Sequence, residues 1–432
     1  MRSDALAFPK SRVGMKEMTR NRTTGLAAIG KLCCVAAIVI GLSAVELMAV
    51  AVSVMPDTYE FLDGSPVSTM SDDAGLLINL GLAQTAYSSV TGAGYSVAIL
   101  DTGVDSTHPA LLGRYVGGWD YVDGDNKPQD DNGHGTHVTG ISVSSDGTYG
   151  GIAPEAGYAA LKVMDAAGHG TFGQLELGLQ WVIANRAAHN IVALNMSLGT
   201  DEIYNTSQTS QISNELSTLK DAGVFIAVSS GNGWFDHSPT EGVASPAADP
   251  SAVAVGDVWT GNFGRVDWTG GATDYTTAAD RIVSHCDRST TMLDIFAPGA
   301  RITNAAYDWE DDNNYFTTKS GTSMASPAVA GLAILIREAI EENWDPILWP
   351  EDEDWQDTIL QIMQDTGVSI HDGDDENDNV ANLDADFSRI DVLAALDYVF
   401  SMSSTAVPEP TTLALAVLGL LSLLFRGRRR RR

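Results

Sequence analysis

Three short polar motifs carry residue types that together can do acid–base and nucleophilic chemistry. They are VAILDTGVD with Asp101, DDNGHGTHVTG with His134, and SGTSMASPAVAG with Ser323. An imidazole at the start of a helix can accept the proton of a serine hydroxyl, and a carboxylate can hold that imidazole in one tautomer. The motifs therefore predict that Asp101, His134 and Ser323 form a catalytic group.

Each motif also has a simpler explanation when it is taken alone. An Asp after a strand is a common turn residue, and a Ser before a buried helix is a common N-cap. His134 and His137 lie three residues apart, as in some metal sites, but no Glu lies between them in a zinc-protease pattern. We interpret His134 as the base, because Gly133 and Gly135 let backbone crowd close to it. We expect His137 to pack against its own helix.

A fourth motif supplies a hydrogen-bond donor for negative charge. Attack of a hydroxyl on a carbonyl creates an oxyanion, which a fixed side-chain amide stabilises by a few kcal/mol. In FIAVSSGNGW the amide is that of Asn232, which lies between two glycines after an apolar run. An Asn-Gly turn is the alternative interpretation.

The residues between these motifs predict the fold that positions them. Continuous apolar runs of strand length alternate with helical stretches, which is typical of an α/β fold with helices on both faces of a mostly parallel sheet. The expected strands are 95–101, 157–164, 191–197, 223–230 and 251–258, and the expected helices include 171–189 and 210–222. In such sheets the catalytic groups gather beyond the carboxyl ends of the strands, where these motifs fall.

Taken together, the motifs resemble the subtilisin-like serine proteases, the subtilase family, from about Leu76 to Val399. The segments that carry the resemblance are DTGVD, GHGTHVTG, NMSLG, SSGN, APG and GTSMASP, in this order. The order Asp, His and Ser along the chain is also that of the subtilisin triad. The resemblance implies the subtilisin-like three-layer fold and serine endopeptidase activity without a catalytic cofactor. Asn232 and the amide of Ser323 would bind the oxyanion.

The resemblance also implies a cleft that binds an extended peptide. Substrate backbone would lie as an added strand between two segments of the chain, with the walls of a side-chain pocket beside them. The two segments are Ser197, Leu198, Gly199 and Gly168, His169, Gly170. The pocket walls would include Ser229, Ser230 and Gly231.

Calcium is the cofactor that the sequence suggests, in a structural role. Residues 119–135 space oxygen-bearing side chains as hard cations require and resemble a calcium loop of one branch of the subtilases. The expected ligands are Asp120, Asp123, Asp125, Lys127 through its carbonyl, and Gln129. A solvated acidic loop is the alternative. A second acidic stretch, 371–386, is interpreted as a solvated loop, with ion binding as its alternative.

The composition of the chain limits which classes of protein and which partners are expected. The chain has 432 residues and a formal net charge of −31, while seven Lys/Arg lie in residues 1–54 and six Arg in 426–432. The strongly anionic centre repels nucleic acid, so no nucleic-acid partner is expected. Cys33 and Cys34 lie in a segment expected to be removed, and Cys286 is then a single small packed residue. We expect a monomer.

Both ends have the composition of targeting signals. Residues 1–51 read as a signal peptide, with a basic start, an apolar stretch and Ala49 and Ala51 before the cleavage point. A retained membrane anchor is the alternative. Residues 52–75 read as a linker or short pro-segment and 76–400 as the peptidase domain.

Residues 401–432 combine VPEP, an apolar stretch and an Arg cluster, and resemble a PEP-CTERM sorting signal. A plain positive-inside anchor is the alternative. The resemblance implies sorting by an exosortase-type enzyme and transient membrane association through the termini. The chain would be exported to the cell surface, envelope or exterior of a Gram-negative-type bacterium, where it would cleave proteins or peptides.

Two other functions compete with the endopeptidase. A scaffold or adhesin can reuse a catalytic fold without cutting, but all four reactive positions are intact here. A lipase-type esterase would need a G-x-S-x-G elbow and a different order of the catalytic residues along the chain. Labelling by a serine-directed probe separates the first alternative from the endopeptidase.

Overall fold

The computed structural model describes residues 51–53, 71–307, 315–343, 354–373 and 377–405. The chain divides into Met1–Met48 and Ala49–Arg432, and the described residues all belong to the second unit. The predicted signal peptide, except Ala51, and the sorting signal from 406 onward lie outside the described residues. Among the described residues, one helix, Thr322–Glu342, is long and apolar enough to cross a membrane, but 94% of its most apolar 18-residue window is buried inside the protein.

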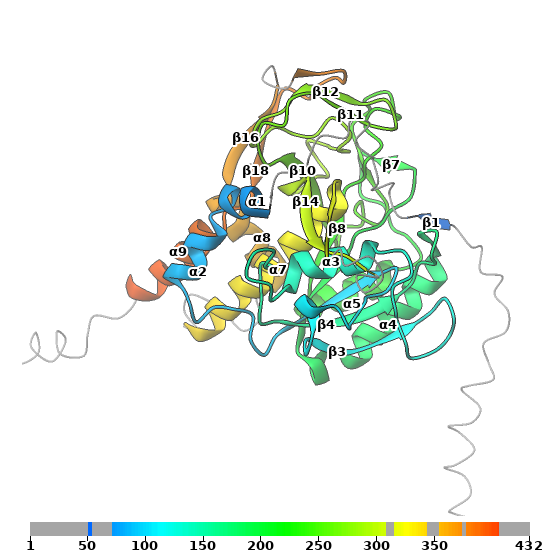
Figure 1. Cartoon of the computed structure of the whole chain (residues 1–432), viewed down its shortest axis with the longest axis vertical. Coiled ribbons are helices and arrows are strands. Elements are labelled where there is room, and N and C mark those ends of the chain that lie inside the picture. The colour runs from blue at the N-terminus through cyan, green and yellow to red at the C-terminus, as the bar shows by residue number, and fades with distance from the viewer. Residues whose placement is uncertain (1–50, 54–70, 308–314, 344–353, 374–376, 406–432) are drawn as a thin grey trace, which may run out of the picture. The chain divides into compact units, whose positions relative to one another are not determined.

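A nine-stranded sheet forms the centre of the described fold (Figure 1). From one edge to the other its strands are β16 (Val368–Asp372), β18 (Ala385–Arg389), β13 (Ile295–Ala300), β10 (Val253–Trp259), β8 (Phe225–Ser229), β6 (Ile191–Met196), β2 (Ser96–Asp101), β4 (Gly157–Lys162) and β3 (Tyr115–Asp120). Neighbouring strands are parallel except for β16 and β18, which are antiparallel. The sheet is therefore mostly parallel, as predicted.

Successive side chains of the central strands enter two different cores, because side chains of a strand alternate between its faces. In β2, Val97 and Ile99 belong to one apolar core, and Ala98 and Leu100 belong to the other. Burying both faces explains why the strands are continuous apolar runs without a polar alternation.

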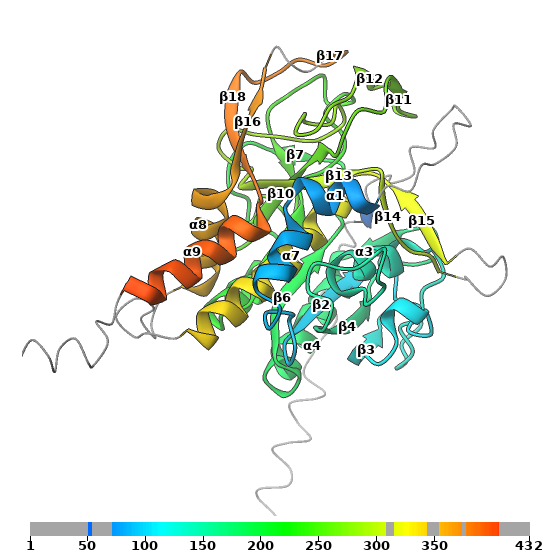
Figure 2. The same cartoon turned by 60° about the vertical axis from the view of Figure 1, so that its left-hand side comes forward.

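Helices cover both faces (Figures 1 and 2). One core contains residues of α2 (Leu80–Ala86), α3 (His134–Val143), α7 (Thr322–Glu342), α8 (Trp355–Thr366) and α9 (Val392–Thr405). The other core contains residues of α4 (Phe172–His189) and α5 (Ser213–Asp221). A short 3-10 helix, Pro109–Leu111, lies between β2 and β3. The predicted three-layer α/β fold is confirmed.

The predicted elements agree with the structure within a few residues at their ends. Helix α4 begins after Thr171, whose side chain and that of Gln174 form a capping box, so the expected helix 171–189 has a local reason to start there. Residues 52–75 were predicted to be a linker or short pro-segment, and this stays a prediction, because 54–70 lie outside the described residues. Helix α1 (Ser71–Leu77) begins inside that range, and its Ala74 packs against the first core.

Four smaller sheets surround the central sheet. They are β11-β12-β17 (Val266–Asp267, Thr273–Thr276, Asn377–Asp378), β14-β15 (Ile302–Ala305, Phe316–Lys319), β7-β9 (Ile203–Tyr204, Val243–Ala244) and β1-β5 (Ala51–Ser53, His169–Thr171). Strand β1 pairs antiparallel with β5, with Val52 opposite Gly170. Figure 2 shows β11, β12 and β17 together near β16 and β18.

The expectation of a plain solvated loop at 371–386 is wrong for part of that stretch. Its two ends extend β16 and β18, and Asn377–Asp378 forms β17. Asp372 is fully buried, with its Oδ2 2.8 Å from Nε of the equally buried Arg288. A buried ion pair keeps this carboxylate inside the protein, which composition alone did not indicate.

Candidate active site

Asp101 and His134 are in direct contact at the carboxyl edge of the sheet. Asp101 is the last residue of β2, and His134 is the first residue of α3. Nδ1 of His134 lies 2.7 Å from Oδ1 of Asp101, and both side chains are almost fully buried. Burial raises the pKa of Asp101, while the neighbouring His134 and the amide of Thr102 act in the opposite direction.

The glycines around His134 allow this close approach. A Cβ added to Gly135 would lie 2.1 Å from the carbonyl oxygen of Gly103 and 3.1 Å from Oδ1 of Asp101. Any side chain at position 135 would therefore push α3 away from the end of β2. The expectation that glycine is needed there for close packing is confirmed.

Sequence reasoning missed a second carboxylate, that of Asp130, which organises this corner. Its Oδ1 accepts hydrogen bonds from the amide of Gly133 and the hydroxyl of Thr102, and its Oδ2 accepts from the amide and hydroxyl of Thr136. The hydroxyl of Thr102 in turn accepts the amide of Gly135. Asp130 thus caps α3 and ties it to the residue after Asp101. Asp130 lies four residues before the first residue of α3, outside the N-cap position that Gly133 occupies, so the usual N-cap preference would not have indicated it.

Ser323 lies in the first turn of α7, after Gly321 at φ 139°. Its hydroxyl donates to the carbonyl of Ser197 at 3.3 Å, and the hydroxyl of Ser197 donates to the carbonyl of Ser323 at 2.7 Å. These paired contacts fix the end of β6 against the start of α7. Helices α3 and α7 also touch, since the hydroxyl of Ser142 donates to the carbonyl of Pro327 at 2.9 Å.

Asn232 is held beside Ser323 by the residue that precedes the serine. The amide and hydroxyl of Thr322 both donate to Oδ1 of Asn232, at 3.0 and 3.1 Å. Because the oxygen of the side-chain amide faces Thr322, its NH₂ group faces the other way. The structure therefore brings Asn232 to the N-terminus of α7, as a donor next to the serine would require.

Two other predicted assignments have different outcomes. His137 does not bond within its own helix: its Nε2 lies 3.1 Å from the carbonyl oxygens of both Ile302 and Thr317 on the β14-β15 hairpin. Burial lowers the pKa of His137 to about 3, so it is a neutral packed residue. Cys286 is fully buried, and burial raises the pKa of its thiol well above the usual value. It is a packed residue, as predicted.

The predicted cleft segments lie around the same edge of the sheet. Ser197, Leu198, Ser229 and Ser230 are fully buried. The hydroxyl of Ser229 reaches the carbonyl of Leu198 at 3.5 Å, so the end of β8 and the segment after β6 are adjacent. His169 and Gly170 begin β5, whose one pairing partner among the described strands is β1.

The predicted calcium loop does not gather its carboxylates. No group of three or more His, Cys, Asp or Glu side chains that could hold a metal occurs in the described part of the chain. Oδ1 of Asp120 accepts the amides of Val122 and Asp123, and Oδ1 of Asp125 accepts the amide of Lys127. These contacts are those of turns, and the side chains of Asp123, Asp125 and Gln129 are exposed. In this arrangement the Oδ1 atoms of Asp120 and Asp125 accept turn amides, and the calcium site stays a prediction.

The fold and these contacts define a class of protein: a three-layer α/β protein of the subtilisin type, with a buried Asp–His pair at the carboxyl edge of its central sheet. The sequence profile of the Subtilase family matches residues 92–382, and that of the PEP-CTERM protein-sorting motif matches residues 406–431. The chain belongs to the subtilase family, a family of serine proteases, and it carries a C-terminal PEP-CTERM motif.

Individual relatives agree with this membership. Serine protease AprX of Bacillus subtilis is 32% identical over 290 residues, 61% of this chain and 60% of the relative. Subtilisin-like protease 3 of Arthroderma benhamiae is 34% identical over 250 residues, covering 57% and 53%. Thermitase of Thermoactinomyces vulgaris is 32% identical over 278 residues, covering 61% and 86%. The chain thus spans between half and two thirds of the length of the first two relatives.

A solved structure is similar as well. The crystal structure of a cold adapted subtilisin-like serine proteinase superimposes with a TM-score of 0.50 at 27% sequence identity. The match covers 70% of this chain and 90% of that chain. It supports the subtilisin-like fold that the central sheet and its helices define.

Proposed function

We propose that this chain is an exported serine endopeptidase in which Ser323, His134 and Asp101 form the catalytic triad. The observation that carries the proposal is the buried contact of 2.7 Å between His134 and Asp101, at the edge of the sheet that also receives the start of α7. A buried imidazole bonded to a carboxylate through Nδ1 presents its other nitrogen for proton transfer.

The proposed reaction proceeds through an acyl-enzyme. The Oγ of Ser323 attacks the scissile carbonyl carbon while its proton passes to Nε2 of His134. The C–N bond then breaks, and the leaving amine takes that proton. Water then attacks the ester carbonyl and gives a proton to His134. The C–Oγ bond breaks, Oγ of Ser323 takes that proton back, and the carboxylic acid product leaves. Asp101 keeps the imidazole in the required tautomer and stabilises it when it is charged.

The oxyanion of each tetrahedral intermediate would bind to Asn232 and to the backbone amide of Ser323. The contacts of Thr322 with Oδ1 of Asn232 support this role, because they turn the NH₂ group away from α7. First-turn amides of a helix have no partner within the helix, so the start of α7 favours negative charge.

Substrate would bind as an extended strand along His169 and Gly170, opposite Ser197, Leu198 and Gly199. The pairing of β1 with β5 supports this mode of binding, because it is an antiparallel strand already added to that edge. Backbone pairing of this kind provides affinity, while the region of Ser229, Ser230 and Gly231 would contact the substrate side chain.

A fluorophosphonate probe tests the proposal on the full chain. Wild-type protein should be labelled at Ser323 and should cleave a casein substrate, whereas Ser323→Ala should do neither. Ser326→Ala is the matched control, because this hydroxyl lies one helical turn further and donates to Asn195. If the probe labels neither wild type nor Ser326→Ala, the result would favour a scaffold that no longer cuts.

The sorting motif supports a proposal about location. We propose that an exosortase-type enzyme processes the C-terminal region and that the protein reaches the cell surface, envelope or exterior of a Gram-negative-type bacterium. Mass spectrometry of the exported protein tests this: the peptide that contains residues 406–431 should be missing from it and present in a strain without exosortase.

A further inference from the structure

The loop that carries Asn232 is hydrogen-bonded along its length to the segment 285–287. The amide of Asp287 donates to the carbonyl of Gly231 at 2.8 Å, and the amide of Trp234 donates to the carbonyl of His285 at 3.1 Å. The hydroxyl of Ser230 donates to the carbonyl of Asp287 at 2.7 Å. Asn232 therefore lies in the middle of a loop that is fixed on both sides.

The side chain of Asp287 adds a contact to the loop itself. The amide of Gly233 donates to Oδ2 of Asp287 at 3.0 Å, and the carboxylate is fully buried. A Cβ on Gly231, which has φ 117°, would lie 2.3 Å from the same oxygen. Gly231 thus allows a carboxylate to lie directly against the backbone of the loop, and a Cβ on Gly233 would lie 2.4 Å from Cε1 of His237.

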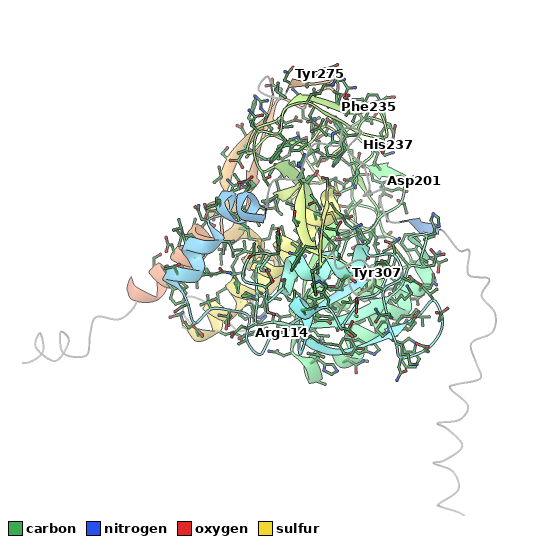
Figure 3. The ribbon with its side chains drawn as sticks, viewed as in Figure 1. Arg114, Asp201, Phe235, His237, Tyr275 and Tyr307 are labelled. Carbon is green, nitrogen blue, oxygen red and sulfur yellow. The ribbon has the colours of Figure 1, made fainter. Side chains whose placement is uncertain are left out.

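His237 pairs with the buried carboxylate of Asp287 and extends the contact to the backbone of Asp201. Its Nδ1 lies 3.3 Å from Oδ1 of Asp287, and its Nε2 lies 2.8 Å from the carbonyl oxygen of Asp201. Figure 3 shows His237 and Asp201 next to each other. Both partners can accept a hydrogen bond, and the imidazole that donates to both at once is the protonated form.

The pKa of His237 is raised, with the hydrogen bond to Asp287 as the largest cause, which agrees with that protonation state. Asp201 follows Gly199 by two residues, so His237 links the loop that carries Asn232 to the segment expected to bind substrate backbone. The charge of Asp236 also raises the pKa of His237.

The neighbouring charges are paired with other groups. His285 lowers the pKa of Asp287, and its Nε2 lies 3.1 Å from Oδ2 of Asp257. The guanidinium of Arg288 is bonded to Asp372 and lies 4.5 Å from the ring centroid of Trp234, the residue that ends the loop. His237 is thus the cation in hydrogen-bond contact with the Asp287 carboxylate.

We propose that Asp287, paired with protonated His237, is a positioning residue that holds the loop 231–233 so that the amide of Asn232 meets the oxyanion. This inference rests on the proposed function, since it requires that Asn232 stabilises a transition state. A misplacement of about 1 Å in a catalytic group can cost about 100-fold in rate. The charge pair would therefore affect kcat, because the oxyanion exists only in the transition state and intermediates.

Steady-state kinetics on a peptide amide substrate test the proposal with two variants. Asp287→Asn keeps the size of the side chain and removes its charge, and His237→Gln removes the cation at a partly exposed position that is less important for folding. Each should lower kcat about 10-fold to 100-fold and leave KM within about twofold. His371→Gln is the matched control, because His371 forms an ion pair with Asp386 on the surface and should keep wild-type kcat.

A double-mutant cycle with Asn232→Ala decides whether the pair acts through Asn232. Asn232→Ala alone should lower kcat about 100-fold or more, and adding His237→Gln to it should then lower kcat less than about twofold further. The positioning role would be overturned if His237→Gln lowered kcat by the same factor with and without Asn232→Ala. A change in KM without a change in kcat would also overturn it. If wild-type protein neither cleaves nor reacts with a fluorophosphonate, the proposed function itself fails. Activity in wild type with additive losses rejects only the role of Asp287 and His237.

Discussion

Oδ1 of Asp101 accepts two hydrogen bonds of 2.7 Å, one from the Nδ1 side of His134 and one from the amide of Thr102. The carboxylate is therefore fixed by its own backbone before it orients the imidazole. Thr102 also contacts Asp130, which caps α3, so one network determines the positions of both partners. Such a network rigidifies a site only when its members are satisfied.

Replacing the charge of Asp101 should therefore stop catalysis without unfolding the protein. Asp101→Asn can present an NH₂ group to Nδ1 of His134, which favours the tautomer that cannot accept the proton of Ser323. Serine proteases with this triad lose on the order of 10⁴-fold in kcat from this change. We expect the same loss here, measured with a peptide amide substrate. A melting temperature close to that of wild type is the control for folding, and retention of more than a tenth of wild-type kcat would contradict the role of Asp101.

A second prediction concerns the pH dependence of stability at Asp294. Burial raises its pKa to about 6, although the amide of Ala254 donates to its Oδ2 at 2.8 Å. A carboxyl group with a raised pKa in the folded state stabilises the protein below its unfolded pKa of about 4 and loses that contribution as pH rises through about 6. Asp294→Asn keeps an acceptor for Ala254 and removes the partly buried charge.

Asp294→Asn should therefore raise the free energy of unfolding at pH 8 by about 1 to 2 kcal/mol and have little effect at pH 4. Urea unfolding at the two pH values measures both numbers, with Ser323→Ala in each protein to prevent self-cleavage. Asp365→Asn, which changes an exposed carboxylate, is the control and should give no pH-dependent difference. Equal effects of Asp294→Asn at pH 4 and pH 8 would show that its pKa is not raised.

The sequence was most informative where one local rule determines a residue's position. The runs 97–101 and 191–196 are apolar almost throughout, and only a strand covered on both faces needs that pattern. Because parallel strands end at the same edge, the residues that follow them were expected to lie together. The contact between His134 and Asp101 follows from this rule and from the two glycines beside His134.

Contacts between distant segments were not predictable in the same way. Asp287 and His237 are 50 residues apart and lie in motifs without a periodic pattern, so nothing local indicates that they meet. Arg288 and Asp372 are 84 residues apart, and their burial contradicts the usual exposure of charged residues. Such pairs depend on how loops cross the edge of the sheet, which composition and spacing do not determine.

Calcium binding by the loop 119–135 stays a prediction, and thermal melting tests it. If a Ca²⁺ ion rearranged Asp120, Asp123 and Asp125 around itself, binding to the folded state alone would raise the melting temperature with ion concentration. Protein with Ser323→Ala should then melt about 3 to 6 °C lower in excess chelator than in millimolar Ca²⁺, which corresponds to about 2 kcal/mol. Asp123→Asn with Asp125→Asn should abolish the difference. An unchanged melt in chelator would mean that this loop binds no calcium.

The pairing of β1 with β5 leads to a last prediction, about competition for the substrate edge. Ala51, Val52 and Ser53 lie opposite Thr171, Gly170 and His169, so a peptide that uses the same edge must displace them. A net gain of about 0.5 to 1.5 kcal/mol for each backbone hydrogen bond predicts a KM roughly tenfold lower for a chain that lacks residues 1–53. A chain that lacks only residues 1–48 keeps β1 and is the matched control, with the KM of the full chain. The predicted signal peptide ends at Ala51, so its removal would take away one of the three paired residues and weaken this competition during export. Equal KM values for the two truncated chains would mean that substrate does not bind along β5.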